Sequence, residues 1–171
     1  MQTFTLVFIF ALLLTTLTQI WLAARHIGHV RTHRGKVPEE FASQISLGDH
    51  KKAADYTCAK TRAGYPGILL HVALLLVFTL GGGLNALSEF WAGWLSDPVL
   101  HGMALIISTF LIMSAADIPL NYYRTFVIEE QYGFNKMTPV MFFTDLIKQS
   151  VLGLLLGAPL LFCVLWLMEK M

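Results

Sequence analysis

Charge is scarce in this sequence. Lysine, arginine, aspartate and glutamate make up 13% of the 171 residues, while hydrophobic residues make up 56%. Soluble domains use about 25% charged residues, so this composition argues against a soluble protein and indicates an integral membrane protein. There are only two cysteines: Cys58 lies in a basic segment and Cys163 in an apolar run. A disulfide between them would cross into the membrane, so a disulfide framework is not expected.

The net charge of +1 hides an uneven distribution. Residues 25–65 hold eight of the twelve basic residues: Arg25, Arg31, Arg34, Lys36, Lys51, Lys52, Lys60 and Arg62. Residues 88–98 hold two Trp and two acidic residues but no Lys or Arg. Because positively charged loops stay in the cytoplasm, we predict a cytoplasmic helical loop at 25–65 and an outside loop at 88–98. The distribution indicates topology, not nucleic-acid binding.

Long apolar runs predict an all-α fold, a polytopic transmembrane bundle. A helix needs about 20 residues to cross a hydrocarbon core of about 30 Å. We expect four spans, at residues 3–24, 67–87, 99–118 and 151–168. Four crossings place both termini outside. The first span is typical of a retained anchor, with a cleaved signal peptide as the alternative.

The basic segment predicts short helices and one possible metal site. Pro38 would begin a short helix, residues 46–49 would form a turn, and a second helix would follow it. His26, His29 and His33 would share a helix face, where His side chains can converge on a metal ion. Lipid headgroups explain a basic, His-rich helix end better, so no metal is expected there.

Residues 122–148 form a polar and aromatic block between the last two apolar runs. Gly133 followed by Asn135 is turn chemistry, because Gly tolerates positive φ and Asn can bond its own backbone. Thr138 and Pro139 then occupy the usual positions of a helix N-cap and a first helical residue. The block is therefore predicted to be a helix end, a tight loop and a helix start.

The run FVIEEQYGFNKMT, followed by Phe142, Asp145 and Lys148, resembles the signature of the membrane-embedded N-terminal region of CAAX prenyl proteases. A weaker likeness covers residues 37–38 and 56–60 of the basic segment. These proteases are zinc metallopeptidases of endoplasmic reticulum and bacterial membranes. The resemblance implies a zinc-dependent endopeptidase, and we expect a bacterial inner-membrane homologue.

The resemblance also implies that the catalytic zinc domain lies outside this chain. The family binds zinc through H-E-x-x-H, and no His-Glu pair occurs in the sequence. We therefore expect residues 1–171 to be inactive alone, with no catalytic residue, metal ligand or cofactor. They would form part of an intramembrane chamber and its cytoplasmic rim. Expected partners are the lipid bilayer, the missing zinc peptidase domain and a peptide or lipidated-peptide substrate, but no nucleic acid.

The candidate rim residues come from the block. The resemblance favours a structural role for them, such as anchoring the rim through an arginine or through the missing domain. The simpler alternative is that the paired glutamates are solvated loop acids. The candidates are Arg124, Glu129, Glu130, Tyr132, Gly133, Asn135, Asp145 and Lys148.

Two other functions remain open. A non-enzymatic membrane scaffold or chaperone-like subunit could have the same N-terminal region without the protease. A small transporter could use ionisable groups in or near the spans, namely His71, His101 and Asp117. Single polar groups spread over several helices more often make contacts between helices than a proton path, so the transporter is the weaker alternative.

Overall fold

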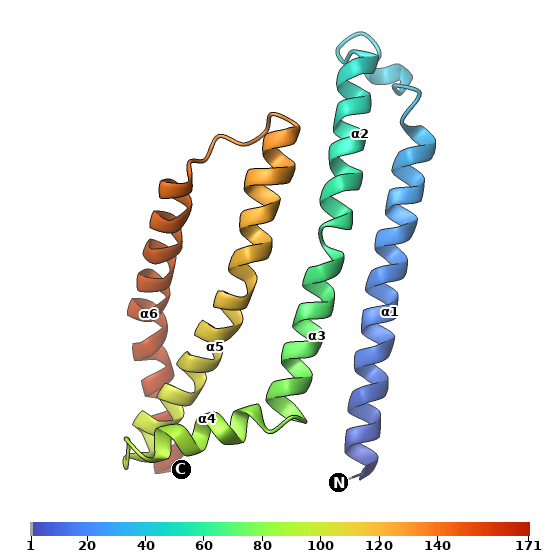
Figure 1. The fold of residues 1–171 in the computed structure, drawn as a ribbon. Coiled ribbons are helices and arrows are strands. Elements are labelled where there is room, and N and C mark those ends of the chain that lie inside the picture. Colours follow the sequence, from blue (N-terminus) through green and yellow to red (C-terminus); the bar gives the residue numbers. More distant parts are fainter. Residues whose placement is uncertain (1) are drawn as a thin grey trace. The chain divides into compact units, whose positions relative to one another are not determined.

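The computed structural model describes residues 2–171, which are helical apart from short turns (Figure 1). Among these residues, four helical stretches are long and apolar enough to cross a membrane: Gln2–His33, Leu47–Thr79, Pro98–Glu129 and Pro139–Lys170. The predicted all-α fold with four spans is confirmed. The chain divides into two compact units. Unit 1 is Met1–Ala73 with Ile118–Asn135, and unit 2 is Leu74–Asp117 with Lys136–Met171.

In unit 1, helix α1 (Gln2–His33) continues beyond its apolar part. At 1.5 Å per residue its length is about 48 Å, well over a core of about 30 Å. After a short 3₁₀ turn, η1 (Glu39–Phe41), helix α2 (Leu47–Arg62) begins. Ser46 caps α2 by accepting a hydrogen bond from the backbone of Asp49. The predicted turn at 46–49 is therefore wrong: these residues are a helix N-terminus, which uses the same Ser and Asp residues as a turn.

Helix α3 (Tyr65–Thr79) ends early, and α4 (Gly83–Ala92) follows as a separate helix. The prediction of one helix over 67–87 is wrong, and so is the prediction that 88–98 is entirely loop. Gly82, the residue before α4, has φ +75°, a left-handed conformation that favours glycine. A Cβ atom at Gly81 would lie 2.8 Å from the Val77 carbonyl oxygen. The glycine run therefore makes a sharp bend that larger residues could not form.

Helix α5 (Pro98–Tyr123) is longer than the predicted span at 99–118, because it passes through Pro119. It continues directly into a π-helix, η2 (Arg124–Glu129). Membrane helices tolerate proline where local π adjustments and neighbouring groups satisfy the freed backbone carbonyls. Short π segments are also found frequently at functional sites.

Helix α6 (Pro139–Lys170) begins where predicted. The Thr138 hydroxyl accepts a hydrogen bond from the Met141 backbone N–H at 3.3 Å, which confirms the predicted N-cap. The irregular part of the 122–148 block is only residues 132–138. The tight loop of the prediction is therefore confirmed, and both of its flanks are helical.

Buried side chains are few in the part of the chain that the structure describes. In unit 1 they are Ile27, Ala54, Cys58 and Ile128, and in unit 2 Val99. Those of unit 1 come from α1, α2 and η2. Most large apolar side chains are exposed, as lipid-facing side chains of membrane helices would be.

Candidate functional site

The motif loop after η2 is held by a glycine-dependent helix cap. The Glu129 carbonyl accepts the backbone N–H of Phe134 at 2.8 Å, and the Glu130 carbonyl accepts that of Gly133 at 2.9 Å. Gly133 has φ +72°. This is the Schellman arrangement, in which the residue after the helix adopts a left-handed conformation that favours glycine. The predicted turn at Gly133 is confirmed.

The paired glutamates make different contacts. The Glu130 carboxylate accepts a hydrogen bond from the Asn135 side-chain amide at 2.9 Å, which closes the exposed side of the loop. This bond is to a side chain, and the prediction that Asn135 also bonds its own backbone stays a prediction. The Glu129 carboxylate accepts a bond from the Tyr56 hydroxyl of α2 at 3.4 Å, a long and hence weak hydrogen bond.

An aromatic cluster surrounds this bond. The Tyr56 ring centroid lies 4.7 Å from that of Phe134 and 5.6 Å from that of Tyr132. The Lys52 Nζ atom lies 5.4 Å from the centroid of the Phe134 ring, and the Lys60 Nζ atom lies 5.5 Å from the centroid of the Tyr56 ring. The two lysines and the tyrosine are four residues apart, so they share one face of α2. We call these five residues the aromatic cluster.

Buried apolar side chains lie on α2 and η2, the elements that carry Tyr56 and Glu129. Ile128, on the π-helix, is only 5% exposed, and Ala54 and Cys58 on α2 are buried too. The Cys58 sulfur lies 4.0 Å from the Ile27 carbonyl oxygen of α1. Helix α2 therefore packs against both α1 and η2, and we call this region the junction of α1, α2 and η2.

An ion pair joins α2 to the segment that follows α1. The Arg34 guanidinium donates two hydrogen bonds to the Asp55 carboxylate, each 2.7 Å long. These bonds raise the pKa of Arg34 above its ordinary value, so the guanidinium stays charged. Asp55 directly precedes Tyr56 in the chain. The pair therefore ties the segment after α1 to the turn of α2 that carries the motif contact.

Some predicted site residues are not in this cluster. The Nε atom of Arg124 is buried and has no hydrogen-bond partner among the described residues, and Glu129 bonds to Tyr56. An anchor from Arg124 to Glu129 is therefore absent from the described contacts. Asp145 and Lys148 lie on α6 in unit 2 and form an exposed ion pair with each other at 3.8 Å.

Sequence reasoning missed three contributors to the site: Lys52, Phe134 and Ile128. The four-residue spacing of Lys52, Tyr56 and Lys60 was a usable signal, because it predicts a common helix face. No local pattern marked Ile128 as buried, since its burial depends on α2, which is distant in the sequence.

The histidines at the end of α1 line a hollow of about 280 Å³ between α1 and α2, together with His50 of α2. His33 Nδ1 donates to the His29 carbonyl at 2.8 Å, and His50 Nε2 donates to the His33 carbonyl at 3.1 Å. His26 is not among the lining residues. Within residues 2–171, no group of three or more His, Cys, Asp or Glu side chains is arranged to hold a metal.

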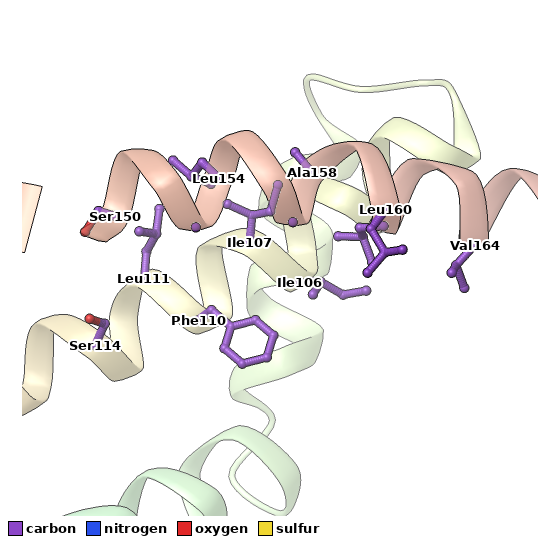
Figure 2. A pocket seen from close by; sticks show the side chains of 13 residues that line it. Ile106, Ile107, Phe110, Leu111, Ser114, Ser150, Leu154, Ala158, Leu160 and Val164 are labelled. Atoms are coloured by element: carbon purple, nitrogen blue, oxygen red, sulfur yellow. The ribbon is translucent and has the colours of Figure 1, made fainter. Parts of the chain in front are cut away.

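Unit 2 contains an apolar groove of about 510 Å³ between α5 and α6 (Figure 2). Phe110 and Ile106 line it from α5, and Leu154 and Val164 from α6. Its floor includes Gly153 and Gly157, where an added Cβ atom would meet nothing within 4 Å. The groove has no charged lining residue, so nothing in it is equipped for acid–base or metal chemistry.

The chain is similar to known proteins over most of its length. Residues 26–171 match the family model described as the CAAX prenyl protease N-terminal region, with five membrane helices. The CAAX prenyl protease 1 homolog of Caenorhabditis elegans is 31% identical over 139 residues, which are 80% of this chain and 30% of that protein. CAAX prenyl protease 1 of Saccharomyces cerevisiae is 30% identical over 148 residues, 79% of this chain and 32% of that protein.

A solved structure shares the fold. The crystal structure of S. mikatae Ste24p aligns with a TM-score of 0.77 and 24% sequence identity, over 93% of this chain and 38% of that chain. This likeness concerns the fold alone. The chain thus spans about a third of the length of the relatives it matches.

Proposed function

Because the chain belongs to the CAAX prenyl protease N-terminal family, we propose that it is the membrane part of a zinc-dependent endopeptidase. In this proposal its spans form part of the wall of an intramembrane chamber, and the junction of α1, α2 and η2 forms the cytoplasmic rim. The full-length enzyme would act on peptides or lipidated peptides.

One observation carries this proposal. The two stretches that resemble the family, at 56–60 and in the 122–148 block, meet through the Tyr56–Glu129 hydrogen bond although 73 residues separate them. Residues of two distant segments that converge on one packed junction favour a shared role over two independent solvated loops. Rim candidates Glu129, Glu130, Tyr132, Gly133 and Asn135 would act by shaping this junction.

Zinc would be held elsewhere in the polypeptide. The donor set of the described residues does not fit a zinc site, so no step of the reaction is assigned to these residues. We expect purified residues 1–171 to contain no stoichiometric zinc and to cleave no peptide. One tightly bound zinc per chain in metal analysis would contradict this, and His29, His33 and His50 would then be the first ligands to test.

A chimera tests the proposed function. Residues 26–171 would replace the matching region of Saccharomyces cerevisiae CAAX prenyl protease 1, and zinc content, melting temperature and cleavage of a prenylated peptide would be measured together. We expect normal zinc and measurable cleavage, and Glu129→Ala in the chimera should lower the rate while zinc stays bound. A folded, zinc-loaded chimera without cleavage would favour the scaffold alternative.

The proposed topology places the N-terminus outside and residues 25–65 in the cytoplasm, as the basic residues require. Cysteine labelling in sealed vesicles tests it, with Cys163 replaced by Ala. Gln44→Cys is preferable to a change at Ser46, which caps α2. Ser96→Cys reports on the opposite loop. Labelling of both positions from the same side would overturn the topology.

A further inference from the structure

Helix α4 is too short to span a membrane. Its exposed surface has a polar side and an aromatic side, like that of a helix that lies on a membrane surface. Its ten residues reach about 15 Å at 1.5 Å per residue. It lies across the end of α5 instead of alongside it (Figure 1). Both helices belong to unit 2, so their arrangement is defined. The bend at Gly82 makes this change of direction possible.

One side of α4 is fixed to α5 by two polar contacts. The Trp91 indole N–H donates to the Ser108 hydroxyl at 3.0 Å. The His101 Nε2 donates to the Ser88 carbonyl at 3.0 Å. The side of α4 that carries these bonds faces α5. The other sides are available for contact with water or lipid.

The remaining sides differ in chemistry. Asn85 and Glu89 are four residues apart, so they share one side, and both are exposed. Phe90 is 57% exposed on a different side, and Trp94, in the turn that follows, is 76% exposed. An exposed polar side beside exposed aromatic rings is the pattern of a helix that lies in a membrane interface.

We propose that α4 is an interfacial helix that binds the lipid headgroup layer, with Phe90 and Trp94 at the acyl boundary and Asn85 and Glu89 in water. The occupant of the aromatic side is lipid, because α4 adjoins the ends of two helices, α3 and α5, that belong to membrane-spanning stretches. The interaction is apolar in origin, since residues 63–123 contain no Lys or Arg to attract anionic lipid. The proposal is independent of the peptidase function.

Spin labelling tests this orientation in the full chain, reconstituted in phosphatidylcholine vesicles. Cys163 would be replaced by Ala, and Cys58 would stay because it is buried. Nitroxides at Phe90→Cys and Asn85→Cys form a matched pair on one helix. We expect the label at 90 to be relaxed mainly by oxygen, which concentrates in lipid, and the label at 85 mainly by a water-soluble nickel chelate.

Three outcomes would overturn the proposal. Nickel access at both positions would place α4 in water, oxygen access at both would place it within the hydrocarbon core, and access at neither would indicate protein contact. A second measurement leaves the helix intact: quenching of tryptophan fluorescence by shallow spin-labelled lipid should fall in Trp94→Phe, and unchanged quenching would contradict the contact of Trp94 with lipid. Adding phosphatidylglycerol should leave the oxygen-to-nickel ratios unchanged, whereas a marked change would contradict an apolar interaction.

Discussion

The two units of this chain differ in where their side chains find partners. Unit 1 concentrates its buried residues at the junction of α1, α2 and η2, where aromatic, ionic and apolar contacts meet. Unit 2 leaves an open groove between α5 and α6 and has one buried residue among those described, Val99. Unit 1 is therefore specified largely by its own side chains, whereas unit 2 depends more on what surrounds it in the membrane.

The largest expected effect is a cavity at the junction of unit 1. Ile128→Ala should destabilise the unit by about 2–5 kcal/mol, because it removes buried methyl groups and leaves a void. The adjacent Val127 is 45% exposed, so Val127→Ala should change stability by about 0.5 kcal/mol or less. Melting in detergent, followed by circular dichroism, measures both. Equal losses would mean that the junction is not specifically packed.

Glycine-to-alanine changes should have opposite signs in the two units. At Gly133, with φ +72°, the left-handed conformation should make Ala unfavourable by about 1–2 kcal/mol. At Gly157 in α6 a Cβ atom meets nothing within 4 Å, so Ala should stabilise the helix by about 0.5–1 kcal/mol. The melting temperature should fall for the first variant and rise for the second. A rise for Gly133→Ala would contradict the Schellman cap.

The Tyr56–Glu129 hydrogen bond should make a smaller contribution. A double-mutant cycle with Tyr56→Phe and Glu129→Gln isolates the coupling, which we expect at about 0.5–1 kcal/mol because the bond is long. The same cycle with Tyr56→Phe and Glu130→Gln is the control, since Glu130 bonds to Asn135 instead. Coupling energies of equal size in both cycles would show that Tyr56 does not interact specifically with Glu129.

The smallest expected effect concerns the exposed ion pairs. Arg34→Ala should loosen the segment before α2 and speed chymotryptic cleavage at Phe41, which is 47% exposed. Lys36→Ala should change cleavage less, because the Lys36–Glu39 pair is almost fully exposed and 3.5 Å long. High salt should reduce the difference between the variants, since it screens surface charges. Identical cleavage rates for Arg34→Ala and Lys36→Ala would contradict the proposal that the Arg34–Asp55 pair orients this segment.

Local chemistry made several features predictable. Thr138 and Pro139 marked the start of α6, because a capping hydroxyl and a preset φ act within one helical turn. Gly133 marked the motif turn, because positive φ is a property of the residue itself. The number of spans, four, followed from apolar length alone. Such features depend on neighbours a few residues away, which the sequence displays directly.

The break at Gly82 could not be located in this way. Hydropathy is averaged over a window, so it places residues 67–87 in one apolar run. The actual bend depends on backbone crowding, since Cβ atoms at Gly81 and Gly83 would lie 2.8 and 2.9 Å from the Val77 carbonyl oxygen. Three glycines permit either close helix packing or a turn, and only the folded backbone distinguishes them.

By itself, the sequence determined that this chain is a membrane protein, how many spans it has, and where its motif turns. The tertiary structure decided which residues form the junction of α1, α2 and η2. Tyr56 meets Glu129, and Ile128 becomes buried, because α2 packs against a π-helix more than sixty residues further along the chain. Contacts at that separation depend on how helices pack in three dimensions, and side-chain spacing along one helix does not encode the position of another.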